Sequence, residues 1–258
     1  MLAELWWIGL GGFFAGLLGA LVGLGGGIVA VPFVNLVVGA SMHCAAAAGL
    51  ISTLTVSCGA AGRYLRKGGF VQVDLALKVE LVTAVGALGG GMAVGYLKGP
   101  VLQVLFAVLL LASALRLALG RESAGDASPP DTPAPPKRIR TVYAMCLTAG
   151  FLGGILGVGG GFLIVPALHL VLALPFKSAA ATSNFVMGMT AVPALLGFAH
   201  RGQVDLRVGV PLAMGVLVGA NLGAFLMPRI QTRSLKWIFA LLLLVAAGQM
   251  IYRGARSW

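Results

Sequence analysis

Long stretches of this chain carry no ionisable side chain, as Val101–Leu115 and Trp237–Gly248 show. Several neighbouring runs reach the roughly 17–25 residues that a helix needs to cross a bilayer. With 59% hydrophobic and 10% charged residues, the chain is more apolar than a soluble domain of 258 residues needs to be. The sequence therefore predicts an all-α integral membrane protein, which we expect to be a multi-pass protein of the cell (inner) membrane.

The formal net charge of +11 does not indicate a nucleic-acid partner. The basic residues lie in short loops and in the tail, so we interpret them as topology signals. Cys44, Cys58 and Cys146 lie in or beside apolar segments without Cys-x-x-Cys spacing, which argues against a disulfide framework or a metal site. We expect neither a metal nor a cofactor.

The two halves of the chain repeat each other. Residues 15–32 and 149–166 are identical at ten of eighteen positions, at a constant offset of 134. A polar turn, an alanine-rich segment, a basic loop ending at Asp74 or Asp205, and a Gly-Ala-x-x-Gly segment follow in the same order in each half. Five prolines in residues 120–140 predict a solvated linker. The sequence thus predicts a first transmembrane repeat (1–119), a cytoplasmic linker (120–140) and a second repeat (141–258).

Each half predicts a first segment interrupted by glycines, followed by three ordinary spans. The predicted segments are 6–38, 45–62, 75–96 and 101–119, then 141–174, 178–199, 208–227 and 235–252. If each interrupted segment crosses once, the chain has eight spans, and if the glycines form a hairpin tip, it has ten membrane segments. In both models, thirteen Lys and Arg residues lie on one face of the membrane and five on the other. The positive-inside rule therefore does not choose between the two models.

Both models place the Arg63–Lys67 loop and the linker in the cytoplasm. An odd number of crossings in each half makes the two halves inverted repeats, an arrangement that many secondary transporters use. We expect inverted repeats with glycine-broken helices at the midplane of the membrane.

The two glycine breaks are the first candidate site. Three consecutive glycines cost a helix about 1 kcal/mol each relative to alanine. A break at membrane depth requires protein or water to satisfy the freed amides. Where the chain re-enters a helix, those amides and the positive end of the helix dipole suit an anion. We therefore expect substrate to bind at these six glycines: Gly25, Gly26, Gly27, Gly159, Gly160 and Gly161. Gly16, Gly19, Gly86 and Gly90 are interpreted as residues that permit close helix crossing.

Polar residues near the breaks are the second set of candidates. Substrate contacts are expected from Thr53, Thr182, Ser183, Asn184 and Asn221. Ser52 and Thr55 lie beside Thr53, and hydroxyls in membrane helices also bond to their own backbone. Asn35, His169 and Glu80 are possible pathway or coupling residues. Packing is an alternative for the first two, and an interfacial ion pair with Lys78 is an alternative for Glu80.

These motifs resemble the sulfite exporter TauE/SafE family of membrane permeases. The duplicated Gly-x-Gly-Gly-Gly-x-x-x-x-Pro, the Ala-Thr-Ser of the second half, and the later Gly-x-Val-Asp and Gly-Ala carry the resemblance from Gly11 to Tyr252. The resemblance implies export of sulfite or organosulfonates, with the family's glycine motif at 25–27 and 159–161 and its Thr-Ser pair at Thr182 and Ser183. The first half has Ala48-Gly49 where that pair is expected, which suggests an asymmetric site.

The sequence predicts a membrane transporter that exports a small anion, with helix N-termini at the two breaks as its binding site. An anion channel and a carrier for another small organic acid remain alternatives. We expect no enzyme, because the chain shows no His-Glu-x-x-His and no paired intramembrane aspartates. The predicted partners are the anionic substrate and the lipid bilayer, and a homodimer is an alternative to a single chain.

Overall fold

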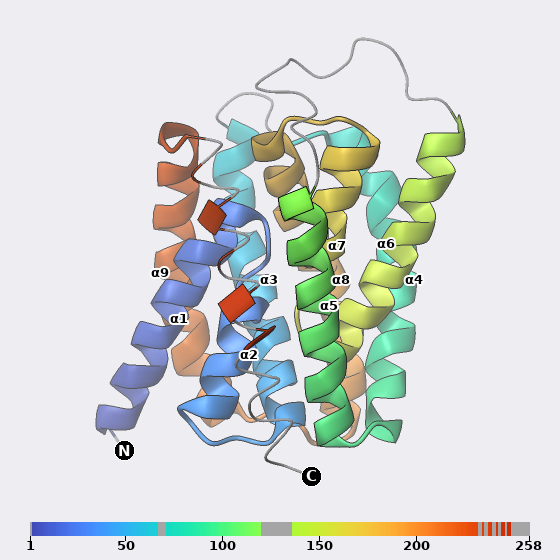
Figure 1. Ribbon diagram of the computed structural model, residues 1–258. Coiled ribbons are helices and arrows are strands. Elements are labelled where there is room, and N and C mark those ends of the chain that lie inside the picture. Colours follow the sequence, from blue (N-terminus) through green and yellow to red (C-terminus); the bar gives the residue numbers. More distant parts are fainter. Residues whose placement is uncertain are drawn as a thin grey trace.

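The computed structural model describes residues 2–66, 71–119 and 136–231, together with eight residues between 234 and 248. The described part of the chain is a bundle of helices without a strand (Figure 1). The first half contains α1 (Leu2–Val22), α2 (Gly27–Leu36), α3 (Met42–Arg66), α4 (Val73–Ala93) and α5 (Gly99–Leu119). The second half contains α6 (Pro136–Leu156), α7 (Gly161–Pro166), α8 (Phe176–His200) and α9 (Leu206–Leu226).

Six of these helices are long and apolar enough to cross a membrane, namely α1, α3, α4, α6, α8 and α9. The expectation of an all-α integral membrane protein is confirmed. Of the predicted linker, residues 120–135 lie outside the described residues, and residues 136–140 form the first turn of α6. The predicted span 235–252 also lies largely outside the described residues.

Both glycine breaks end a helix, as the sequence predicts. α1 ends at Val22 and α6 at Leu156, each directly before a glycine with a φ of 79°. Gly25 and Gly26, with φ of 68° and 65°, also adopt the left-handed conformation that other residues adopt only with strain. In the second half, Gly159 and Gly160 repeat this geometry. The backbone therefore leaves the helix and turns within four residues.

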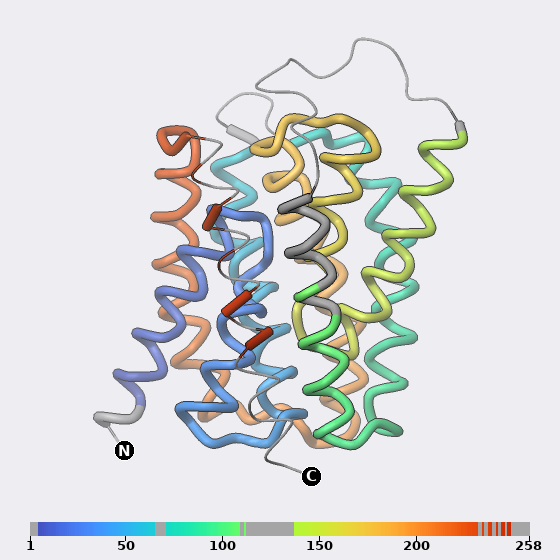
Figure 2. The backbone as a smooth tube through the Cα atoms, in the orientation of Figure 1, coloured from blue at the N-terminus to red at the C-terminus, as the bar shows by residue number. Residues whose placement is uncertain are grey.

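Each break is the tip of a hairpin. Gly11 of α1 lies against the ring of Phe33 in α2, and Gly19 lies against Gly26, so α2 runs back along α1. Gly153 lies against Gly160 in the same way in the second half. The smooth trace in Figure 2 shows both reversals inside the bundle. A helix of ten residues such as α2 rises about 15 Å, roughly half of a bilayer's hydrocarbon core. The structure thus favours the hairpin model over the single-crossing model.

The first helix of each half packs against a helix of the other half. Gly12 lies against Leu212, and Gly16 lies against Val216, so α1 and α9 run in the same direction. At these crossings a Cβ atom on the glycine would overlap backbone atoms of the other helix. The close approach therefore depends on glycine.

α4 and α6 repeat this pairing. Gly86 lies against Leu147 and Gly90 against Phe151, which makes these two helices parallel. The interpretation of Gly86 and Gly90 as crossing residues is confirmed, as is that of Gly16. Because each pairing joins one helix from each half, the two halves interlock and form one core.

Helix directions follow from these contacts. α3 runs parallel to α9, since Ile51 lies beside Gly209 and Gly59 beside Ala220. In Figure 1, α1, α3 and α9 run one way, and α4, α6 and α8 run the other way. Because α1, α3 and α4 correspond to α6, α8 and α9 in the repeat, these are the directions that inverted repeats require. Inversion across a bilayer stays a prediction.

Candidate functional site

The two glycine tips, residues 23–27 and 157–161, lie against each other at the centre of the bundle. A Cβ atom on Gly27 would lie 2.6 Å from the carbonyl oxygen of Gly157, and one on Gly161 would lie 2.7 Å from the carbonyl oxygen of Gly23. These two contacts are equivalent in the two halves. Gly27 corresponds to Gly161, and Gly23 corresponds to Gly157, at the repeat offset of 134. All residues from 23 to 27 and from 157 to 161 are buried.

The contacts between the tips and α3 and α8 are also reciprocal. Gly23 lies against Ala180 of α8, and Gly157 lies against Ala46 of α3. Reciprocal contacts of this kind are what a two-fold relation between two units produces. Thr53 and Met187, which are themselves equivalent, both lie beside Gly25 and Gly159 and therefore lie close to the pseudo-two-fold axis.

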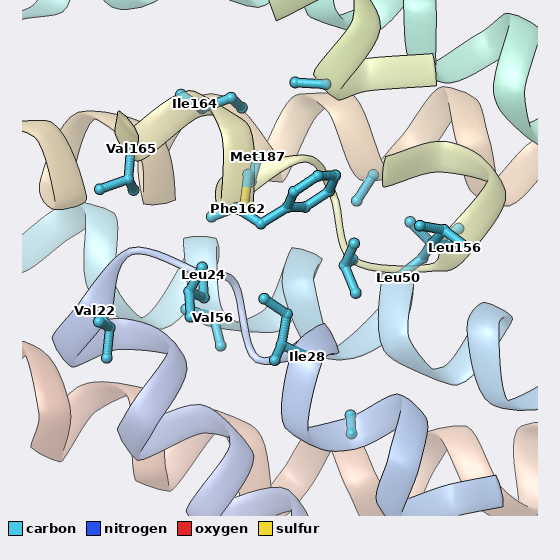
Figure 3. Packing of buried hydrophobic residues seen from close by; sticks show 14 of the residues in the cluster. Val22, Leu24, Ile28, Leu50, Val56, Leu156, Phe162, Ile164, Val165 and Met187 are labelled. Atoms are coloured by element: carbon cyan, nitrogen blue, oxygen red, sulfur yellow. The ribbon is translucent and has the colours of Figure 1, made fainter. Parts of the chain in front are cut away.

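Apolar side chains fill the remaining space around the tips. Figure 3 shows Leu24 of the first tip, Ile28 of α2 and Phe162 of α7 gathered in one region with Met187 and Leu50. All of these side chains are buried. A substrate can reach the tips only if these side chains or the tips themselves move.

Backbone amides at both tips lack acceptors. Within the described residues, the amides of Gly25, Gly26 and Ile28 have no hydrogen-bond acceptor, and the same holds for those of Gly160, Gly161 and Phe162. Each set lies at the start of the helix that runs back from the tip, which is α2 in the first half and α7 in the second half. We call these two helices the return helices. The first amides of a helix have no acceptor within that helix. Six donors are thus available at the centre of the bundle.

Polar side chains gather at the first tip. Ser183 Oγ donates a hydrogen bond to the Gly23 carbonyl at 2.9 Å, and Asn184 Nδ2 donates to the Ala20 carbonyl at 3.0 Å. Tyr64 Oη donates to that same carbonyl at 2.7 Å. Ser52 Oγ lies beside Gly26 and has no hydrogen-bond partner among the described residues, and neither has Asn184 Oδ1.

Two other candidate hydroxyls have local partners. Thr53 Oγ1 donates to the Gly49 carbonyl one turn earlier at 2.9 Å, so the methyl group of Thr53 is what faces Gly25 and Gly159. Thr182 Oγ1 accepts a hydrogen bond from the backbone amide of Gln72 at 3.1 Å. Thr182 thereby fixes the chain that enters α4 against α8.

Asn35 and His169 play equivalent parts in the two halves. Asn35 Nδ2 donates to the Ala40 carbonyl at 2.9 Å, and His169 Nδ1 lies 2.7 Å from the Leu174 carbonyl. In each half the partner is five residues further on. Both side chains are buried, and these bonds close the turn that follows the return helix. Their position supports the packing alternative for both residues.

Asn221 lies away from the tips. Its Oδ1 accepts a hydrogen bond from Arg63 Nε at 3.2 Å, and its Nδ2 donates to the Leu217 carbonyl at 2.9 Å. The guanidinium of Arg63 also lies 5.9 Å from the centroid of the Phe225 ring. The structure therefore does not bring Asn221 together with the glycine tips.

Glu80 is 5% exposed on the inner face of α4, whereas Lys78 is exposed. No ion pair joins them among the described residues, and Glu80 Oε1 has no hydrogen-bond partner there. The expected ion pair with Lys78 is therefore not present in the described part of the chain. A buried carboxylate oxygen without a hydrogen bond is costly inside a membrane helix, and Glu80 therefore keeps its interpretation as a coupling residue.

Tyr64 was not identified as a site residue from the sequence, although it lies at the first tip. A comparison of the repeats would have indicated it, because Tyr64 and Ser52 are polar where Phe198 and Val186 are apolar in the second half. A separate apolar groove of about 430 Å³ between α4 and α6 is lined by exposed residues such as Val85 and faces outward. It suits lipid chains better than an anion.

Comparison with known proteins connects this architecture to one family. A family model described as "Sulfite exporter TauE/SafE" matches residues 8–250. A probable membrane transporter protein, YunE of Bacillus subtilis, is 29% identical over 95% of this chain and 97% of its own length. A probable membrane transporter protein of Xylella fastidiosa is 30% identical over 97% of this chain and 93% of its own length.

A plant protein also matches part of the chain. "Sulfite exporter TauE/SafE family protein 6" of Arabidopsis thaliana is 22% identical over 44% of this chain and 27% of its own length. No solved structure matches the chain.

Proposed function

The chain belongs to the sulfite exporter TauE/SafE family of membrane transporters, and from this membership and the geometry of the two tips we propose that it exports a small oxyanion. The proposed substrates are sulfite and organosulfonates, and the proposed binding site lies between the tips at 25–27 and 159–161. The inner membrane is the proposed location.

The meeting of the two tips is the observation that carries this proposal. Within the described residues, six amides of the buried tips have no acceptor, and no lysine or arginine is buried in the bundle around them. Such amides bind oxyanions because they donate hydrogen bonds while the positive end of the helix dipole lies behind them. The protein therefore does not need a buried cation to hold a negatively charged substrate.

Alternating access fits the closed state of the tips. Thr53 and Met187 lie between the tips, so binding and release require the two interlocked halves to separate first on one side and then on the other. Inverted repeats supply two equivalent conformations for such a change. An inside-negative potential favours export by about 2.3 kcal/mol per charge per 100 mV, so we propose that no coupling cation is needed.

Matched glycine variants test the site. In Gly26→Ala the new Cβ atom lies against Ser52 Oγ, and in Gly160→Ala it lies 2.7 Å from the Ala149 carbonyl oxygen. Gly39→Ala and Gly202→Ala are controls, since these glycines also have positive φ but no atom within 4 Å of a Cβ. In liposomes with a potassium-diffusion potential, ³⁵S-sulfite and ³⁵S-methanesulfonate fluxes are measured for equal amounts of folded protein.

We expect the added Cβ atom to displace the tip amides from the substrate, so that the tip variants lose more than about tenfold in flux, which corresponds to one hydrogen bond to a charged group. The controls should keep most of their flux. Flux of neither probe through the wild type would contradict the proposed substrate class. Flux through the tip variants equal to that of the controls would contradict the proposed site. Flux that does not saturate with substrate would favour a channel.

A further inference from the structure

The two tips differ in the polar groups that surround them. We propose that the first tip, residues 23–27, binds the charged head of the substrate, with Ser52 as a binding residue whose hydroxyl donates to it. This inference rests on the proposed function, because it concerns the same site. From the repeat alone, both tips would be expected to bind the charged head equally.

Ser52 differs from its hydroxyl neighbours on α3. Thr53 and Thr55 donate to the carbonyls of Gly49 and Ile51, four residues earlier. Ser52 is fully buried, lies beside Gly26, and has no partner among the described residues. Burying a hydroxyl without a hydrogen bond costs about 1–3 kcal/mol. A substrate oxygen at the first tip would relieve that cost.

The side chains at the first tip cover its carbonyl groups. The carbonyls of Ala20 and Gly23 lie at the C-terminal end of α1, where the partial charge is negative and would repel an anion. Tyr64 and Asn184 both donate to the first of these carbonyls, and Ser183 donates to the second. These three residues are positioning residues, because they satisfy the acceptors and leave the amide donors to face the substrate.

The second tip lacks all of these groups. The residues equivalent to Ser52, Tyr64, Ser183 and Asn184 are Val186, Phe198, Gly49 and Leu50. Thr190 Oγ1 donates to the Gly159 carbonyl of the second tip at 3.4 Å and to the Met187 carbonyl of its own helix at 3.1 Å. Among the described residues, no side chain donates to the carbonyls of Gly154 and Gly157, which correspond to Ala20 and Gly23. The return helices have similar lengths, because α7 continues as a π-helix from Ala167 to Val171, so the two tips differ in their side chains rather than in their helices.

An oxyanion therefore meets more donors and fewer exposed acceptors at the first tip. The second tip and the space between the tips present the Thr53 methyl group and the Met187 thioether. These groups suit the short carbon chain of a sulfonate. The site as a whole fits an organic oxyanion with one charged head and a small apolar part.

The test compares equivalent positions in the two halves. Ser52→Ala removes the unpaired hydroxyl at the first tip, and Val186→Ala is the matched change at the second tip. Equilibrium binding of ³⁵S-sulfite and ³⁵S-methanesulfonate is measured with purified full-length protein in detergent, and thermal stability is recorded for each variant. Tyr64→Phe is a second variant, which copies the residue present in the other half.

We expect Ser52→Ala to weaken binding of both probes by about ten- to a hundredfold, as for the loss of a hydrogen bond to a charged group, with its melting temperature unchanged or raised. Val186→Ala should bind within about threefold of the wild type. Tyr64→Phe should weaken binding, because the Ala20 carbonyl loses the hydrogen bond from Tyr64 and repels the anion more strongly.

Wild-type affinity in Ser52→Ala, or a larger loss in Val186→Ala, would overturn the assignment to the first tip and leave the proposed function standing. A lower melting temperature of Ser52→Ala with unchanged affinity would show a structural role and overturn it as well. Absence of binding to the wild type would overturn the proposed substrate class together with this inference.

Discussion

The contact between the first tip and α8 predicts a specific loss of stability for Gly23→Ala. The added Cβ atom would lie 2.5 Å from Ala180 Cα and 2.8 Å from the Ala180 carbonyl oxygen. Backbone atoms of a packed helix cannot rotate away, so the tip or α8 must shift. Overpacking of this kind costs about 1–3 kcal/mol.

The left-handed conformation adds a second cost. Gly23 has a φ of 79°, where an L-residue with a side chain loses about 1–2 kcal/mol. Gly39→Ala isolates this second cost, because Gly39 has a φ of 75° and no atom within 4 Å of its Cβ position. The difference between the two variants is therefore the overpacking cost. In a domain of 150–250 residues each kcal/mol shifts the melting temperature by about 2–4 °C.

We thus expect Gly23→Ala to melt roughly 2–12 °C below Gly39→Ala. The assay heats detergent-solubilised protein and measures the monodisperse fraction by fluorescence-detected size exclusion. Gly157→Ala should behave like Gly23→Ala, because its Cβ atom would meet the backbone of Ala46. Equal melting temperatures for Gly23→Ala and Gly39→Ala would show that the first tip does not pack against α8.

Three further predictions concern single side chains. Asn184→Leu should weaken substrate binding more than Asn35→Leu, because Asn184 Nδ2 donates to the Ala20 carbonyl at the first tip, whereas Asn35 Nδ2 donates to the Ala40 carbonyl in the turn after α2. Asn35→Leu should instead lower the melting temperature, and the reverse order would contradict both placements. Glu80→Gln should keep voltage-driven flux and raise the melting temperature, because it removes a buried carboxylate whose Oε1 has no hydrogen bond among the described residues. Loss of flux in a stable variant would identify a coupling residue. Lys137→Cys, in a chain without its native cysteines, should be labelled only from the cytoplasmic side, because Lys137 is exposed in the first turn of α6; labelling from outside intact cells would reverse the orientation.

Several features of this protein follow from the sequence alone. Apolar runs longer than a bilayer requires indicate a membrane protein, since no soluble core needs them. The helices end at Val22 and Leu156 because a left-handed glycine follows each of them and three consecutive glycines come soon after, and this local property is visible in the sequence. The duplication, read from identities at a fixed offset, likewise needs no coordinates.

Local patterns did not decide between a broken span and a hairpin. The direction of the chain after the glycines depends on contacts between distant residues, such as Gly11 with Phe33 and Gly19 with Gly26. Lysine and arginine counts could not reveal it, because both topologies divide these residues in the same proportion.

The composition of the candidate site was decided by tertiary structure. The interlocked halves bring α3 and α8 to the same tip, so Tyr64 and Asn184 share one carbonyl although they are 120 residues apart. Asn221, a polar residue in an equally apolar helix, is held at Arg63 instead. The sequence shows which side chains need polar partners in a membrane. Which partner each one finds depends on which helices cross and on the height of the crossing. Glycine contacts between the two halves determine the crossings and their height.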